Sequence, residues 1–156
     1  MVEAADTIET ALDISCSSSE NLILDDFRRL TGPGFLWSHV GANLDVLCPT
    51  ADLDEVIKVW QQQARRVLDA IGWHSEQIID RRFEGGANLA VSAPMDQLYS
   101  AMFACQTAWH FASAQLLNQT ANNFDIMIND LRNVMVREAN PALITLITVA
   151  KKHGID

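Results

Sequence analysis

Two apolar-rich runs on either side of a glycine turn constrain the fold more than any other feature. The runs are IIDRRF and ANLAVSA, and Glu84, Gly85 and Gly86 lie between them. Glycine adopts the backbone angles that tight reversals need, so the pattern predicts a β-hairpin. A lone hairpin is at best marginally stable in water, and the rest of the chain must therefore supply strands or helices that pack on it.

A further strand is indicated upstream of the hairpin. The run ANLDVLC, which Pro49 ends, places its apolar side chains on one side and Asn43 and Asp45 on the other. This alternation is typical of a half-buried strand. The earlier run NLILDDFRRL is compatible with either a short helix or a strand.

Helical spacing dominates the remaining apolar segments. In ADLDEVIKVWQQQARRVLDAIGW, Asp52 and Glu55 are placed as a capping box and Gly72 as a stop. Pro94 is expected to open a long central helix with a broad apolar stripe. The segments FDIMINDLRNVMVREA and NPALITLITVAKKHG follow as two more helices, with Asn140 as the N-cap of the second.

The order of these elements predicts an α+β fold. We expect a small antiparallel sheet of about three to four strands, covered by about three to four helices. The first twenty residues include SCSSSE and are expected to be a flexible lead-in, residues 1–20. The 156-residue chain is long enough for one domain, which we place at residues 21–156. The four tryptophans are expected to be core anchors.

Composition limits the compartment and the partners. The acidic N-terminus lacks the basic start and apolar core of a secretory signal. Cys16, Cys48 and Cys105 are widely spaced, which fits free thiols in the cytoplasm. No apolar run approaches the roughly 20 residues that span a bilayer, so no membrane association is expected. The net charge of -9 argues against nucleic acid as a partner.

Catalytic signatures are absent from the sequence. It has no glycine-rich phosphate loop ending in Gly-Lys-Ser/Thr, no G-x-S-x-G and no H-E-x-x-H. The histidines have no partner at a metal-ligand spacing, so neither a metal nor a cofactor is expected. Cys48 and His39 would allow a thiol nucleophile if they met, but Cys48 also continues the apolar face of its strand.

Paired arginines mark the most informative polar segments. Arg28 and Arg29 precede the turn Gly32-Pro33-Gly34, and Arg81 and Arg82 lie in the predicted hairpin. The turn is foremost a chain reversal, and it is also the predicted rim of an anion site with Arg28 or Arg29 and Arg82. In a strand Arg81 and Arg82 must point to opposite faces, so only one of them joins the core side.

The order of RRLTGPGFLW, RRFEGGANLAVSAPMDQLYSA and EANPALITLITVAKKHG resembles the N-terminal domain of cyanophycin-synthetase-like members of the Mur ligase family, over about residues 25–155. These enzymes form amide bonds with ATP. The resemblance adds Gly85, Gly86 and Ser92 to the candidate binding residues. In the family the Gly-Pro pair is usually followed by Asn, where this chain has Gly34. The family's ATP-binding domain would follow this region, so no ATP-dependent ligase activity is expected of this chain alone.

Two functions of different classes follow. The first is a non-catalytic substrate-binding or assembly module, with an amino acid or peptide as ligand and with a homo-oligomer or a separate ligase subunit as partner. The alternative is a small enzyme that acts on a carboxylate-bearing substrate through Cys48, His39 and the arginines. We prefer the first. The sequence leaves open the identity of the ligand, the oligomeric state and whether the chain is a fragment.

Overall fold

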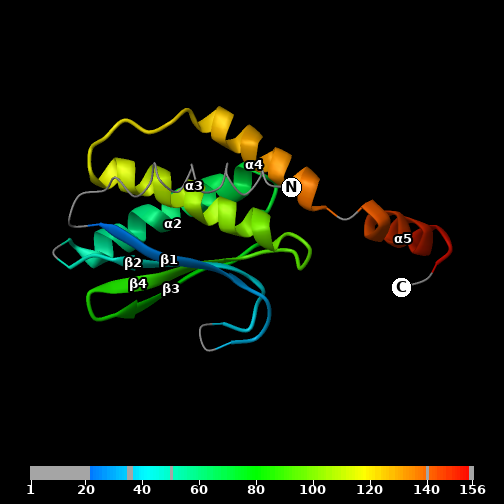
Figure 1. Cartoon of the computed structure of the whole chain (residues 1–156), viewed down its shortest axis with the longest axis horizontal. Coiled ribbons are helices and arrows are strands. Elements are labelled where there is room, and N and C mark those ends of the chain that lie inside the picture. Colours follow the sequence, from blue (N-terminus) through cyan, green and yellow to red (C-terminus); the bar gives the residue numbers. More distant parts are fainter. Residues whose placement is uncertain (1–21, 35–36, 50, 140, 155–156) are drawn as a thin grey trace.

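The computed structural model describes residues 22–34, 37–49, 51–139 and 141–154, apart from the side chains of 141–145 and 147, and it has the expected α+β fold (Figure 1). The strands form one antiparallel sheet in the order β1-β2-β4-β3. They are β1 (Ile23–Leu30), β2 (Gly41–Leu47), β3 (Ile78–Phe83) and β4 (Gly86–Ser92). The helices are α2 (Leu53–Ala70), α3 (Leu98–Leu116), α4 (Phe124–Glu138) and α5 (Pro141–Lys152).

The segment that fitted either a helix or a strand is β1. Its Phe27 is paired with Leu44 of β2 and packs against the core, whereas its neighbour Arg28 is exposed. A register shift between Leu24 and Asp26 lets the strand keep this alternation. The predictions of β2 and of the β3–β4 hairpin are confirmed.

The capping and proline signals in the sequence predict the start of α2 correctly but not that of α3. The Asp52 side chain accepts hydrogen bonds from the amides of Asp54 and Glu55, at 3.0 and 3.4 Å, and α2 begins at Leu53 as predicted. The prediction that Pro94 opens the next helix is wrong, because the amide of Gln97 donates to the carbonyl of Pro94 at 2.9 Å. That turn delays α3 to Leu98. Asn140, the predicted N-cap of α5, lies outside the described residues.

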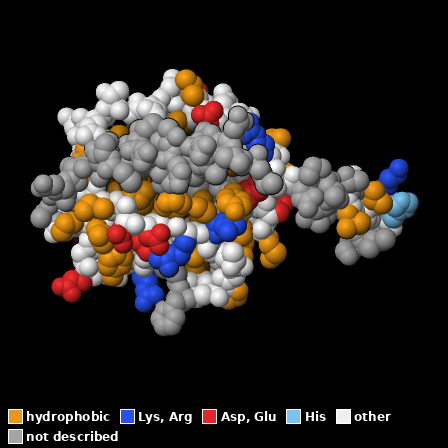
Figure 2. Space-filling model, viewed as in Figure 1, with side chains coloured by type: hydrophobic (Ala, Val, Ile, Leu, Met, Phe, Trp, Pro, Cys, Tyr) orange, Lys and Arg blue, Asp and Glu red, His pale blue; other side chains and the backbone are white. Residues whose placement is uncertain are grey.

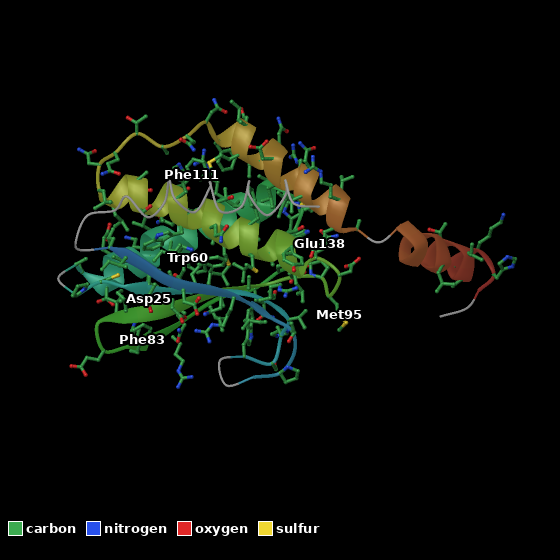
Figure 3. All side chains as sticks on the ribbon, viewed as in Figure 1. Asp25, Trp60, Phe83, Met95, Phe111 and Glu138 are labelled. Atoms are coloured by element: carbon green, nitrogen blue, oxygen red, sulfur yellow. The ribbon has the colours of Figure 1, made fainter. Side chains whose placement is uncertain are left out.

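The core lies between the sheet and the helix layer. Trp60 of α2 and Trp109 of α3 are almost completely buried there, and Figure 3 places Trp60 between the sheet and the helices. Helix α3 packs against α2, α4 and β2, which makes it the central helix that its broad apolar stripe predicts. The helices thereby bury one face of the sheet.

The opposite face of the sheet remains open to polar groups. Figure 1 shows α2, α3 and α4 on one side of the sheet and the β1–β2 loop on the other, while α5 extends away from the body. An antiparallel sheet tolerates this arrangement because its strands can alternate apolar and polar side chains. The open face is therefore the place where the strands can present polar side chains together.

Candidate functional site

A small pocket of about 250 Å³ lies on the open face of the sheet, against the β1–β2 loop. Its volume is below the range of about 300–1,000 Å³ that is usual for drug-sized ligands, so it suits a small molecule. The strands and the loop both contribute to its walls. It is lined by Arg28, Leu30, Gly32, Gly34, Trp37, Asn43, Arg81 and Asn88.

Strand pairing explains why these side chains meet. Arg28 is paired with Asn43, and Asn88 is paired with Arg81. Asp45 is paired with Asn88, and Asn43 with Ala90, so the polar side chains lie in two adjacent rows that are two residues apart along β2. Directly paired residues of antiparallel strands project to the same face, and strands lie about 4.8 Å apart, so β1 and β3 are separated by about 14 Å. The two arginines, which belong to the edge strands β1 and β3, therefore lie on either side of the two asparagines, which belong to the central strands β2 and β4.

The carboxylate of Asp45 connects the two rows. It accepts hydrogen bonds from Arg28, from Nδ2 of Asn43 at 2.8 Å and from Nδ2 of Asn88. Its side chain is only 14% exposed, and Arg28 also contacts Asp26 at 3.3 Å. Asp45 is thus occupied by three donors, and its role is to hold the pocket side chains in position.

The β1–β2 loop forms one wall of the pocket. The amide of Gly34 donates to the carbonyl of Trp37 at 2.9 Å, which closes the turn and uses the donor that an anion would need. The Trp37 ring packs edge-on against His39, with ring centroids 4.8 Å apart. Trp37 is only half-buried, so the expectation that it is a core anchor is wrong. The turn is therefore both a chain reversal and a pocket wall.

Arg29 and Arg82 point to the helix side of the sheet. The Arg29 guanidinium lies 4.3 Å from the centre of the Tyr99 ring of α3. Arg82 forms an ion pair with Asp54 in the first turn of α2. Strand alternation separates each arginine pair, so the structure brings Arg28 together with Arg81 and places Arg82 away from the pocket.

The other predicted binding residues have contacts that support the fold. Gly85 adopts the left-handed conformation, with φ of 85°, in the β3–β4 turn. Gly86 leaves no room for a side chain, since a Cβ there would lie 2.0 Å from the carbonyl oxygen of Val46. The Ser92 hydroxyl accepts from the amide of Gln77 at 2.7 Å and donates to Glu76. None of these three residues lines the pocket.

Cys48 and His39 lie beyond opposite ends of β2. That strand has seven residues, which at about 3.4 Å each span roughly 24 Å. Cys48 is buried and burial raises the pKa of its thiol, whereas His39 is exposed beside Trp37. The structure does not bring the two side chains together, and burial disfavours the thiolate that a nucleophile would need.

The pocket residues that the sequence did not single out are Leu30, Trp37, Asn43 and Asn88, with Asp45 behind them. Alternation in β2 did place Asn43 and Asp45 on the polar side of the strand. The alternation could not predict which residues of β4 lie beside them, because the register of β2 with β4 is set by contacts between segments that are far apart in the chain.

Neither a metal centre nor a membrane span is found in the described part of the chain. Among those residues no group of three or more His, Cys, Asp or Glu side chains has the geometry to hold a metal ion. Of the described helices, none is long and apolar enough to cross a membrane, and a cytoplasmic location stays a prediction.

A scan against protein-family models and searches of curated proteins and solved structures gave no match, so the resemblance to the ligase family rests on the quoted motifs alone.

Proposed function

We propose that the chain is a non-catalytic binding module that holds a small carboxylate-bearing molecule in the pocket on the open sheet face. The observation that carries this proposal is the group of polar side chains from two adjacent rows of the sheet, in which Arg28 lies beside Asn43 and Arg81 beside Asn88. Guanidinium groups offer forked N–H donors that match the two oxygens of a carboxylate.

The chemistry of the walls favours binding over catalysis. The described residues that line the pocket include no thiol, imidazole or hydroxyl group. The nearest carboxylate, Asp45, already accepts from Arg28, Asn43 and Asn88. A carboxylate that accepts from three neighbouring donors is suited to holding those neighbours in position.

The experiment is a titration of the ¹⁵N-labelled protein with small carboxylates such as acetate, succinate and 3-phenylpropanoate, followed by NMR. We expect shifts to centre on the amides of Asn43, Asn88 and the β1–β2 loop. Arg81→Gln should weaken binding at least tenfold, because it removes one of the flanking guanidinium groups. Thermal unfolding of the variant separates lost binding from lost folding.

Arg82→Gln is the matched control. It removes the same charge from the neighbouring position, but its side chain lies on the helix side of the sheet beside Asp54. We expect its affinity for the carboxylates to stay within about twofold of the wild type. Equal losses in both variants would show that only overall charge matters, and an absence of shifts around the pocket with every probe would refute the proposal.

Assembly is a second candidate function, and one observation favours it. Leu146 and Val149 of α5 are 64% and 47% exposed on a helix that extends from the body (Figure 1). Exposed apolar side chains on one element are common where a partner docks. Light scattering of the protein, compared with Leu146→Glu, tests for a homo-oligomer: we expect the variant to shift the mass toward that of a monomer. The ligase subunit stays a prediction.

A further inference from the structure

Asn43 carries the most informative polar atom in the pocket. Its side chain lines the pocket and is only 3% exposed. Nδ2 donates to Asp45, but Oδ1 has no hydrogen-bond partner among the described residues. A buried acceptor without a donor costs about 1–3 kcal/mol, and such atoms are rare in native proteins. Because Asn43 lines the pocket, a ligand bound there is placed to supply the missing donor.

The orientation of this amide is fixed by its surroundings. A flipped side chain would turn Oδ1 toward the Asp45 carboxylate, and two acceptors would then face each other. With Nδ2 held by Asp45, the oxygen is the end of the amide that remains for a ligand. The ligand must consequently bring a hydrogen-bond donor to this position.

The donor should be positively charged. The Asp45 carboxylate polarises the Asn43 amide through the Nδ2 hydrogen bond, which increases the negative charge on Oδ1. A hydrogen bond from an ammonium group to such an oxygen is stronger than one from a neutral N–H.

The charges around the pocket also balance. Arg28 contacts Asp26 and Asp45, and Arg81 lies on the same side of the sheet as these three residues. Figure 2 shows acidic and basic side chains next to one another along the edge of the sheet that is in view. A molecule without net charge but with separated charges leaves this balance intact, whereas a simple anion does not.

We infer that the pocket takes a zwitterion of amino-acid size, with its ammonium group on Oδ1 of Asn43 and its carboxylate toward the guanidinium groups of Arg28 and Arg81. The apolar part of the ligand then faces Leu30 and Trp37. This inference rests on the proposed function and adds the ligand's donor end, for which Asn43 is the specificity-determining residue.

The test uses pairs of probes that differ only in the α-amino group. Suitable pairs are phenylalanine with 3-phenylpropanoate, leucine with 4-methylpentanoate and glutamate with glutarate, titrated into the wild-type protein and followed by NMR. In the best-bound pair we expect the amino acid to bind at least tenfold more tightly than its partner. This comparison needs no variant, so it cannot fail through misfolding.

Asn43→Leu, which keeps a side chain of similar size, completes a double-mutant cycle. We expect this variant to lose the tenfold preference between the two members of a pair, and the ratio of the two affinities is the quantity compared with the wild type. Asn88→Leu is the control, because it also removes an amide donor to Asp45 and leaves Oδ1 of Asn43 in place. Whatever it does to the affinity for both probes, the ratio between the amino acid and its des-amino partner should stay at least tenfold.

The outcomes separate the two proposals. Binding of neither member of any pair at the pocket refutes the proposed function itself. A des-amino carboxylate that binds as tightly as the amino acid overturns the zwitterion alone. An N-acetylated amino acid that binds more tightly than the free one also overturns it, and points to the C-terminus of a peptide.

Discussion

The carboxylate of Glu138, at the end of α4, accepts hydrogen bonds from both the amide and the hydroxyl group of Ser100, in the first turn of α3. Oε2 lies 2.7 Å from the Ser100 amide nitrogen and 2.5 Å from Oγ, and Oε1 lies 2.6 Å from the Tyr99 amide nitrogen. The N-cap of α3, Gln97, makes no capping hydrogen bond with its own side chain. A residue from another helix therefore caps α3 and places a negative charge at its N-terminus (Figure 3).

This contact predicts a stability loss in Glu138→Ala. Removal of the carboxylate leaves two helix-start amides and a buried hydroxyl group unsatisfied, so the free energy of unfolding should fall by about 1–3 kcal/mol. Urea denaturation measures it. Asp130→Ala is the control, because it removes a carboxylate from the exposed side of the same helix and should change stability by less than about 0.5 kcal/mol. Equal losses in the two variants would rule out the cap.

Gly86→Ala should destabilise the pairing of β2 with β4. The added Cβ would lie 2.0 Å from the Val46 carbonyl oxygen and 2.9 Å from the Phe83 ring, and the carbonyl belongs to the backbone of the neighbouring strand. We expect a loss of about 1–3 kcal/mol in the free energy of unfolding, as for other overpacked sites. Gly32→Ala provides the comparison, since its Cβ would meet nothing within 4 Å. A Gly86 variant as stable as the Gly32 variant would contradict the packing described.

His110 should make stability depend on pH. Its Nε2 accepts a hydrogen bond from the Asn122 amide at 3.0 Å, and burial lowers the pKa of the ring. The unfolded chain then binds a proton more readily than the folded one. The contribution is complete above the unfolded pKa of about 6.5 and is lost as the pH falls through it toward the lower folded pKa.

Urea denaturation at about pH 8 and about pH 5 isolates this effect when the wild type is compared with His110→Gln. Glutamine retains an acceptor but does not titrate in this range. The wild type should lose more stability than the variant on acidification. Parallel losses would mean that the ring titrates alike in both states.

The thiols of Cys48 and Cys105 should be unreactive in the folded protein. Burial raises the pKa of both and brings that of Cys105 to about 12. In a Cys16→Ser variant at about pH 8, a chromogenic disulfide should label these thiols at less than about a hundredth of the rate seen in urea. Rapid labelling of Cys48 would restore the enzyme alternative.

The fold was predictable where its signals are local. The alternation in β2, the Asp52 cap of α2 and the glycine turn before β4 each depend on residues close together in the chain. The start of α3 could not be predicted in this way. A turn at Pro94 takes the place of the first helical turn, and the residue that caps the helix is Glu138 of α4, which is 38 positions from Ser100.

The site was predictable only in part. The basic residues beside the Gly32–Gly34 turn indicated the loop that forms one wall of the pocket, and Arg28, Gly32, Gly34 and Arg81 line that pocket. The choice between adjacent arginines depends on which face of the sheet is covered, and the sequence did not settle that. To predict that Asn43 and Asn88 share the pocket, one would have to know the register of β2 with β4, and these strands are separated in the chain by a whole helix and a strand.

The pocket has lining residues from β1, β2, β3 and β4, so the loss of any of these strands removes part of its wall. A molecule that binds there binds the native chain and not the unfolded one, and mass action then transfers its binding energy to the whole sheet. At a hundred times its dissociation constant, such a ligand adds about 2.7 kcal/mol to the stability of the chain. The melting temperature of this protein is therefore itself a readout of occupancy, and a thermal screen of small metabolites should find the ligand without any assay of activity.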